Sequence, residues 1–338
     1  TEEQQQIIDT AKGFLDKEFP VSAALNLPEG QSRFSPSDLG QIASLGWLGI
    51  GLEEQKGGVG CGLCEEALLF IELGRVLMPP SLIASVLGAR LAAFHGLDRV
   101  LTNILEGNCK IATTLARNNS NVTIGQKVEG EFIVLEAEDA DYVLVVDDSG
   151  AALVDLDALE HLANENCLDP TISATRYRAK QCEATAYLSA NEESIFQRGA
   201  LLCSALLLGI AEATLDRSVA YAKEREQYGK PIGSFQSIKH CCADMAIRCE
   251  SLKAMLYHAS ITLGQKEATG LFDLNTAKAL AIDMAKDNAN TAVQIHGGMG
   301  YTQEMDIHLF VKRAQILATL FGSERYHLRE LLTRDRPD

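Results

Sequence analysis

Three long helical stretches in the second half of the chain constrain its fold more than any other feature. Residues 196–223 are rich in Ala and Leu, and residues 233–264 place apolar side chains at helical spacing. Residues 273–295 form a third such stretch, which ends at Gly297-Gly298. Because these stretches are apolar enough to bury more than one face each, we predict a helical bundle that also packs against other subunits.

The first third of the chain is predicted to be helical and the middle to be a sheet. A helix start is recognisable where Ser35 precedes Pro36, an N-cap followed by proline in the first helical turn. From residue 108 the pattern changes to short β-rich runs, and 142–146 and 151–154 flank a turn as a hairpin would. Further strand is expected within 174–188.

Two shorter helices, 306–319 and 323–332, are predicted to close the chain. The order of helices, strands and helices indicates an α+β protein. We place its three parts at residues 1–107, 108–192 and 193–338.

Composition excludes several classes of function. The net charge of −16 argues against nucleic acid or an anionic membrane as a partner, because both attract basic patches. We see no apolar run of the roughly 20 residues that span a bilayer, and no signal or transit peptide at the polar start. The nine scattered cysteines fit reduced, buried thiols in a cytoplasmic protein. Cys61 and Cys64 have metal-ligand spacing, but without a second pair we interpret them as small residues entering a helix and expect no metal.

A first group of candidate binding residues follows the 196–223 helix. Arg225 stands where a helix ends, so it could merely complement the helix dipole, or it could bind a pyrophosphate. The residues that follow favour the second interpretation. Gln227 and Gln236 offer amide donors, while Tyr228 and Phe235 offer aromatic faces for an adenine.

A second group lies where the 273–295 stretch ends. Gln294 precedes Gly297 and Gly298, and a glycine pair is most often a simple helix stop. Residues without a Cβ also let main-chain N–H groups approach a phosphate or ribitol closely. His296 between them is interpreted as a packing or surface residue rather than a catalytic one.

These segments together resemble the C-terminal helical domain of the acyl-CoA dehydrogenases, flavoenzymes that desaturate acyl-CoA thioesters. The resemblance rests on Arg-Glu-Gln-Tyr-Gly-Lys-Pro at 225–231, Ser-Phe-Gln at 234–236 and Gln-Ile-His-Gly-Gly-Met-Gly-Tyr at 294–301. It implies an N-terminal helical domain, a middle β-barrel-like domain and a C-terminal four-helix bundle. It also implies that both groups bind FAD, and that this FAD is held mainly by a neighbouring subunit.

The catalytic base of that family is missing at both positions where its members carry it. Desaturation needs a carboxylate to remove the α-proton while a hydride passes to the flavin. The usual glutamate aligns with Phe321, and the alternative position on the long helix aligns with Gly199. The family arginine beside it aligns with Ala200, and Arg198 should point elsewhere because a helix turns about 100° per residue.

Three other carboxylates lie near these positions in sequence. Glu192 and Glu193 precede the long helix and should sit roughly 9–10 Å back along its axis. Glu324 is the close carboxylate downstream of Phe321, and we interpret it as a first-turn helix residue.

The segments that cover and bind the flavin ring in the family are also altered. Residues 113–120 read Thr-Thr-Leu-Ala-Arg-Asn-Asn-Ser, without the family's Thr-Glu-Pro-x-x-Gly-Ser-Asp pattern. Where the family has a Trp and a hydroxyl residue against the isoalloxazine, this chain has Ile133 and Leu135. Groups for the chain's own flavin pocket are therefore lost, while groups for a neighbour's FAD are kept.

The resemblance thus predicts the non-catalytic subunit of a heteromeric α2β2 acyl-CoA dehydrogenase. The partner subunit is expected to carry the glutamate and bind the acyl-CoA, possible substrates are CoA esters of steroid side chains, and an electron-transfer flavoprotein is the expected acceptor. Two alternatives stay open. The chain could be a self-sufficient dehydrogenase using an unconventional base such as Glu324, or a non-redox scaffold protein of the same fold.

Overall fold

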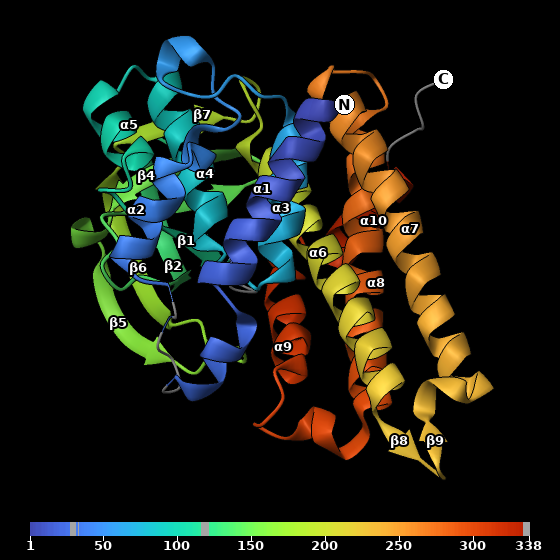
Figure 1. Ribbon diagram of the computed structural model, residues 1–338. Coiled ribbons are helices and arrows are strands. Elements are labelled where there is room, and N and C mark those ends of the chain that lie inside the picture. The colour runs from blue at the N-terminus through green and yellow to red at the C-terminus, as the bar shows by residue number, and fades with distance from the viewer. Residues whose placement is uncertain (28–31, 33, 116–121, 334–338) are drawn as a thin grey trace.

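Helices of the first hundred residues pack on one side of a curved sheet, and a bundle of long helices stands beside both (Figure 1). The computed structural model describes residues 1–27, 32, 34–115 and 122–333. The N-terminal elements are α1 (Glu2–Glu18), η1 (Val21–Asn26), α2 (Pro36–Ser44), η2 (Trp47–Gly49), η3 (Glu54–Lys56), α3 (Leu63–Arg75), α4 (Ser81–Phe94) and α5 (Asp98–Leu105).

Helix α2 begins at the predicted position. Helix α4 is a helix that the sequence pattern did not delimit. The Ser35 hydroxyl accepts from the backbone N–H of Asp38, and Pro36 is the first helical residue. Helix α4 packs against strand β1 and helix α6, and it is buried on nearly all sides. A helix without a polar face has no periodic signal, so its separate existence was not evident from the sequence.

The middle of the chain forms one seven-stranded mixed sheet in the order β5-β6-β2-β1-β3-β4-β7. Its strands are β1 (Ile111–Leu115), β2 (Lys127–Leu135), β3 (Tyr142–Asp147), β4 (Gly150–Asp155), β5 (Glu160–Glu165), β6 (Ala174–Glu183) and β7 (Ala186–Ser189), with η4 (Leu156–Ala158) between β4 and β5. Only the β1–β3 pair is parallel among the pairings of these strands.

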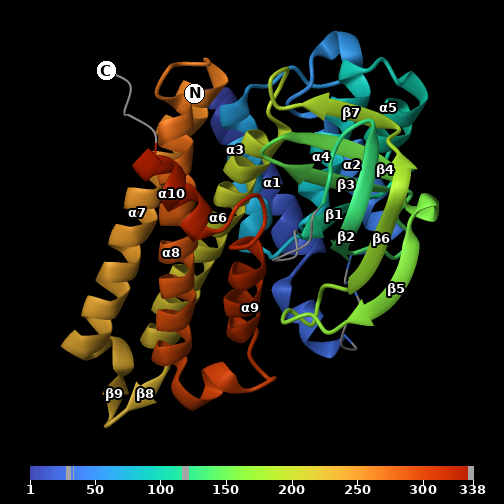
Figure 2. The ribbon, with the colours of Figure 1, turned by 180° about the vertical axis from the view of Figure 1, so that it is seen from behind.

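The curved sheet, seen from behind in Figure 2, has an apolar core on each face. Leu135, Leu144 and Leu153 face the large core shared with the helices. Phe132, Val134 and neighbouring side chains of alternate strand positions form a smaller core on the other face. The central strands are therefore packed on both faces of the sheet, whereas the edge strand β5 is largely exposed.

The C-terminal part is built from α6 (Ile195–Glu224), α7 (Gln236–Gly264) and α8 (Gly270–His296), followed by α9 (Ile307–Leu317) and α10 (Glu324–Thr333). A short hairpin of β8 (Glu226–Gln227) and β9 (Lys230–Pro231) with η5 (Ile232–Ser234) joins α6 to α7, and η6 (Gly297–Tyr301) follows α8. Every predicted helix of this part is present, with ends shifted by a few residues. Helix α6 has the length and composition to cross a membrane, but 83% of its most apolar window is buried inside the protein, as in a core helix.

A buried ion pair fastens α9 to the other two parts of the molecule. The Arg313 guanidinium donates to the Asp169 carboxylate at 2.6 Å and to the backbone carbonyls of Leu77 and Met78 at 2.6 Å each. Burial opposes ionisation of Asp169, but Arg313 and the Thr171 hydrogen bonds hold its pKa below the usual value. Helix α9 is therefore anchored both to the loop between β5 and β6 and to the segment between α3 and α4.

Candidate functional site

The turn between α9 and α10 brings Phe321 into the core. Phe321 is 6% exposed and has a positive φ of 53°, a backbone conformation that bulky residues rarely adopt. His327 holds this turn from α10, because one ring nitrogen contacts the Phe321 carbonyl at 3.0 Å and the other contacts the Asn275 amide oxygen at 2.7 Å. Burial lowers the pKa of His327 to about 4, so at physiological pH the ring is neutral and donates its single N–H to only one of these two oxygens.

The ring of Phe321 lies directly against Gly199 on α6. A Cβ placed on Gly199 would stand 2.3 Å from the nearest ring carbon, far inside van der Waals contact. The two positions that align with a catalytic base therefore face each other across one small space. That space is filled by the Phe321 ring, and neither of the two positions carries a carboxylate.

Further aromatic side chains surround this contact. The Phe196 ring lies 6.4 Å from the Phe321 ring and 5.5 Å from the Tyr326 ring, both edge to face. The Tyr326 hydroxyl lies 3.1 Å from Asp148 at the β3–β4 turn. The adjacent cavity has a volume of about 190 Å³, below the range of roughly 300–1,000 Å³ typical of sites for drug-sized ligands.

Three charged side chains near Gly199 in sequence have other partners, and a fourth, after Phe321, begins a helix. Arg198 forms a buried ion pair with Glu66 of α3 at 2.6 Å, which confirms that it points away from Gly199. Glu193 pairs with Arg90, and Glu192 accepts from the backbone N–H of Ser189. Glu324 is the first residue of α10, where a carboxylate favours the helix N-terminus.

The strands expected to bind a flavin ring present apolar side chains. Leu135 is fully buried in β2 opposite Thr113, and Ile133 stands opposite Leu115 in β1. Neither residue carries a hydrogen-bonding group. Residues 116–120, where the family pattern for covering the flavin is missing, lie outside the described residues. The residues of this chain's own pocket thus do not fit a bound isoalloxazine, since the base and the ring donor are replaced by apolar groups.

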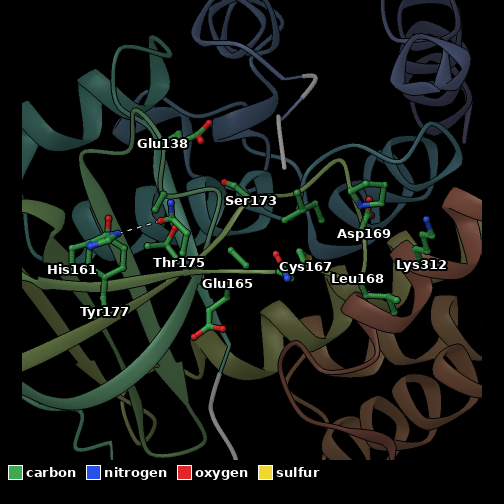
Figure 3. A pocket seen from close by; sticks show the side chains of 16 residues that line it. Glu138, His161, Glu165, Cys167, Leu168, Asp169, Ser173, Thr175, Tyr177 and Lys312 are labelled. Atoms are coloured by element: carbon green, nitrogen blue, oxygen red, sulfur yellow. Dashed lines mark hydrogen bonds between the residues drawn. The ribbon is translucent and has the colours of Figure 1, made fainter. Parts of the chain in front are cut away.

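A separate cavity lies between the β5–β6 strands and α9 (Figure 3). Its volume is about 890 Å³, and polar side chains including His161, Glu165 and Lys312 line it. Neither Phe321 nor Gly199 belongs to its lining. We therefore assign no part of the predicted site to it.

The first predicted binding group is exposed at the far end of the bundle. Arg225 caps α6, Gln227 and Tyr228 lie in the β8–β9 hairpin, and Phe235 and Gln236 open α7. Tyr228 is 93% exposed, and its ring lies 6.1 Å from that of Phe235. Lys230 places its ammonium over the Phe235 ring at 4.4 Å.

The second predicted group, Gln294, Gly297 and Gly298, lies at the same end of the bundle (Figures 1 and 2). Gly297 has φ +59°, and nothing lies within 4 Å of a Cβ built on either glycine, so their backbone is open to a ligand. His296 is 4% exposed and stacks on Tyr221 with 4.3 Å between ring centres, which confirms its predicted packing role. This stacking joins the last turn of α6 to the end of α8.

The two ends of the bundle are too far apart to serve one cofactor. Gly199 and Arg225 are separated by 26 residues of sequence, and at 1.5 Å per helical residue this amounts to about 39 Å along α6. Such a distance is well beyond the length of one dinucleotide. A cofactor held by Arg225 and its neighbours cannot reach the Phe321 turn of the same chain.

Comparisons with known proteins agree with this architecture. Sequence models for "Acyl-CoA dehydrogenase, N-terminal domain" and "Acyl-CoA dehydrogenase, C-terminal domain" match residues 1–103 and 190–334. Acyl-CoA dehydrogenase IpdE2 of Mycolicibacterium smegmatis is 29% identical over 332 residues, which are 98% of each chain.

Two solved structures have the same fold. A chain of the ChsE4–ChsE5 complex from Mycobacterium tuberculosis superposes with a TM-score of 0.84 at 22% identity, over 99% of this chain and 98% of that one. A variant of the Tcur3481–Tcur3483 steroid ACAD gives a TM-score of 0.83 at 23% identity, over 98% and 96%.

Proposed function

Because the chain belongs to the acyl-CoA dehydrogenase family, we propose that it is the non-catalytic subunit of a heteromeric flavin-dependent acyl-CoA dehydrogenase. In this role it completes the FAD site of a partner subunit and performs no proton abstraction itself. The partner carries the catalytic glutamate and binds the acyl-CoA thioester.

The observation that carries the proposal is the contact between Phe321 and Gly199. Both positions that hold a base in this family are occupied by one apolar contact, and a glutamate at Gly199 would collide with the Phe321 ring. Proton removal needs a carboxylate within hydrogen-bond reach of the α-carbon. The cavity beside these aromatic rings holds about 190 Å³, which is little room for a thioester.

The exposed end of the bundle supports the proposal that this chain completes the FAD site of a partner subunit. Arg225 is suited to a pyrophosphate, Tyr228 and Phe235 to an adenine face, and the backbone of Gly297 and Gly298 to close approach by a phosphate or ribitol. The amide side chains of Gln227, Gln236 and Gln294 add hydrogen-bond donors at the same end. FAD, when bound, supplies hydride acceptance, and these residues hold and orient it for the partner's pocket.

Names of the similar proteins support the assembly and the substrate class. ChsE4–ChsE5 is described as a complex and Tcur3481–Tcur3483 as a steroid ACAD. By analogy, we propose that the present chain belongs to an α2β2 assembly that acts on CoA esters of steroid side chains. An electron-transfer flavoprotein would take the electrons from the reduced flavin.

Turnover by the reconstituted pair tests which chain holds the base. The chain is co-expressed with its partner, and the partner's predicted glutamate is replaced by glutamine. We expect turnover to vanish, and Phe321→Glu in this chain to leave it abolished because the surrounding pocket is also closed. Turnover that survives loss of the partner's glutamate, or turnover by the lone chain, would contradict the proposal.

A further inference from the structure

A lysine and a cysteine meet in the core beneath the Phe321 turn. Lys278 on α8 and Cys203 on α6 are both fully buried. The Lys278 ammonium donates to the Cys203 sulfur at 2.9 Å and to the Leu317 carbonyl at 3.1 Å. The Cys203 sulfur itself lies 3.2 Å from the same carbonyl. Leu317 ends α9, four residues before Phe321.

This environment is unusual for a buried amine. Burying an ammonium is costly unless it is paired with a charge or fully hydrogen-bonded, and its three N–H groups need acceptors. Among the described residues, the hydrogen-bond partners of Lys278 are one sulfur and one carbonyl oxygen, with no carboxylate. The nitrogen and sulfur are held at a separation that a single oxygen atom could bridge.

We propose that Lys278 and Cys203 form an oxidative modification site, at which dioxygen joins the two side chains through one oxygen atom. The bridge forms an N–O and an O–S bond and breaks the S–H bond, two N–H bonds of the ammonium and the O–O bond; the S–H hydrogen and one N–H hydrogen enter the water formed. The second oxygen atom leaves as water, and one proton leaves from the ammonium. Nitrogen and sulfur each lose two electrons, which together reduce dioxygen. The product is an Nζ–O–Sγ link between α6 and α8.

The pairing distinguishes Cys203 from the other buried thiols. Cys249 on α7 is 3% exposed, but its sulfur accepts from the Asn288 side-chain amide at 3.2 Å, and burial raises the pKa of its thiol to about 12. Cys109 lies beside Asp141, and burial raises the pKa of that thiol to about 12 as well. Neither sulfur has an amine as its hydrogen-bond partner among the described residues. Cys249 therefore provides a matched control.

The link would tie the bundle together at a point that supports the Phe321 turn. It closes a loop between positions 75 residues apart in sequence. A cross-link of this kind lowers the conformational entropy of the unfolded chain, and this raises the midpoint of thermal unfolding. The site is independent of flavin binding, so its test stands whether or not the chain serves a partner's FAD.

Peptide mapping of the full-length chain, kept in air or under anaerobic conditions, tests the proposal. In air we expect the peptide containing Cys203 joined to the one containing Lys278, with a mass gain of one oxygen less two hydrogens. Trypsin should no longer cleave after Lys278, and a thiol reductant should reverse the link and lower the unfolding midpoint. Cys249→Ser should keep the link, and Cys203→Ser should abolish it.

The wild-type chain kept under anaerobic conditions is the reference for the unlinked state, so the comparison does not depend on whether a variant folds. If the folded chain exposed to air keeps a free Cys203 and a cleavable Lys278, the proposal is overturned. Sulfinic acid at Cys203 without a link to Lys278 would overturn it equally, because ordinary thiol oxidation would then explain the chemistry.

Discussion

The two ends of α6 have opposite characters. Near its start, Gly199 is fully enclosed and a ring carbon of Phe321 fills the place of its side chain. Past its end, Arg225 and the 93% exposed Tyr228 lie open to solvent. The end at Gly199 and Phe321, which we call the closed end, holds apolar groups where the chemistry requires a carboxylate. The end at Arg225 and Tyr228, which we call the open end, exposes groups suited to a dinucleotide.

This difference distinguishes loss of function from a change of role. A chain that had simply decayed has no reason to keep an arginine, amides, aromatic faces and an open glycine pair at one exposed end. Exposed aromatic side chains are costly to solubility, and aromatic and arginine side chains are both typical of binding surfaces. Closing one end and keeping the other is what a subunit needs when it serves a cofactor belonging to its partner.

Gly199→Glu should give the largest effect, because it tests the closed end directly. The added side chain collides with the Phe321 ring and buries a carboxylate, which should cost about 3–5 kcal/mol of unfolding free energy. Urea unfolding of the lone chain measures this. Gly298→Ala is the matched control at the open end, where the Cβ meets nothing within 4 Å, and should change stability by less than about 0.5 kcal/mol.

Combining Gly199→Glu with Phe321→Gly sharpens this prediction. Removing the ring frees space for the carboxylate, so the double variant should be less destabilised than the sum of the two single changes. Simple additivity would mean that the two positions do not share one space.

Acid should destabilise the closed end through His327. Its folded pKa of about 4 lies below the unfolded value of 6.5, so the unfolded chain binds more protons between these pH values. This contribution to stability is complete above pH 6.5 and is lost as pH falls towards 4, by about 2.5 kcal/mol between pH 7.5 and pH 4.5.

The pH dependence is isolated by comparing variants. His327→Gln should flatten the fall in unfolding free energy below pH 6.5, and His240→Gln on the exposed face of α7 should not. An equal slope in wild type and His327→Gln would show that this histidine does not titrate as its burial requires.

Arg225→Ala should give a smaller effect, confined to the open end. In the complex we expect FAD affinity to fall roughly thirtyfold, or about 2 kcal/mol, because a charge-assisted hydrogen bond is lost. The stability of the lone chain should stay within about 0.5 kcal/mol, since Arg225 is exposed. Lys223→Ala, another exposed cation in the last turn of α6, is the control. Equal FAD affinity in both variants would count against binding at this end.

Local signals in the sequence were sufficient for most helices. The helices predicted at 196–223 and 306–319 are observed at Ile195–Glu224 and Ile307–Leu317. The agreement is close because capping residues and turns fix helix ends locally. Helix α4 was not separated from its neighbours, since a helix buried all round has no polar face. The empty base positions could also be found by alignment with the family.

Contacts between distant segments could not be predicted in the same way. That Phe321 packs on Gly199, or that Lys278 reaches Cys203, depends on how α6, α8 and the turn after α9 come together. No spacing in the sequence encodes such distances. The roles of Arg225, Gln294 and their neighbours remain predictions, although the structure brings them to one end of the bundle.

Flavin content per chain tests the central claim most directly. The chain is purified alone and again after assembly with its partner, and FAD is quantified against protein in each sample. We predict little or no FAD in the lone chain, and about one FAD per pair of chains in the complex. A full complement of FAD in the lone chain would contradict the account, because it would mean that the pocket beside Phe321 binds flavin by itself.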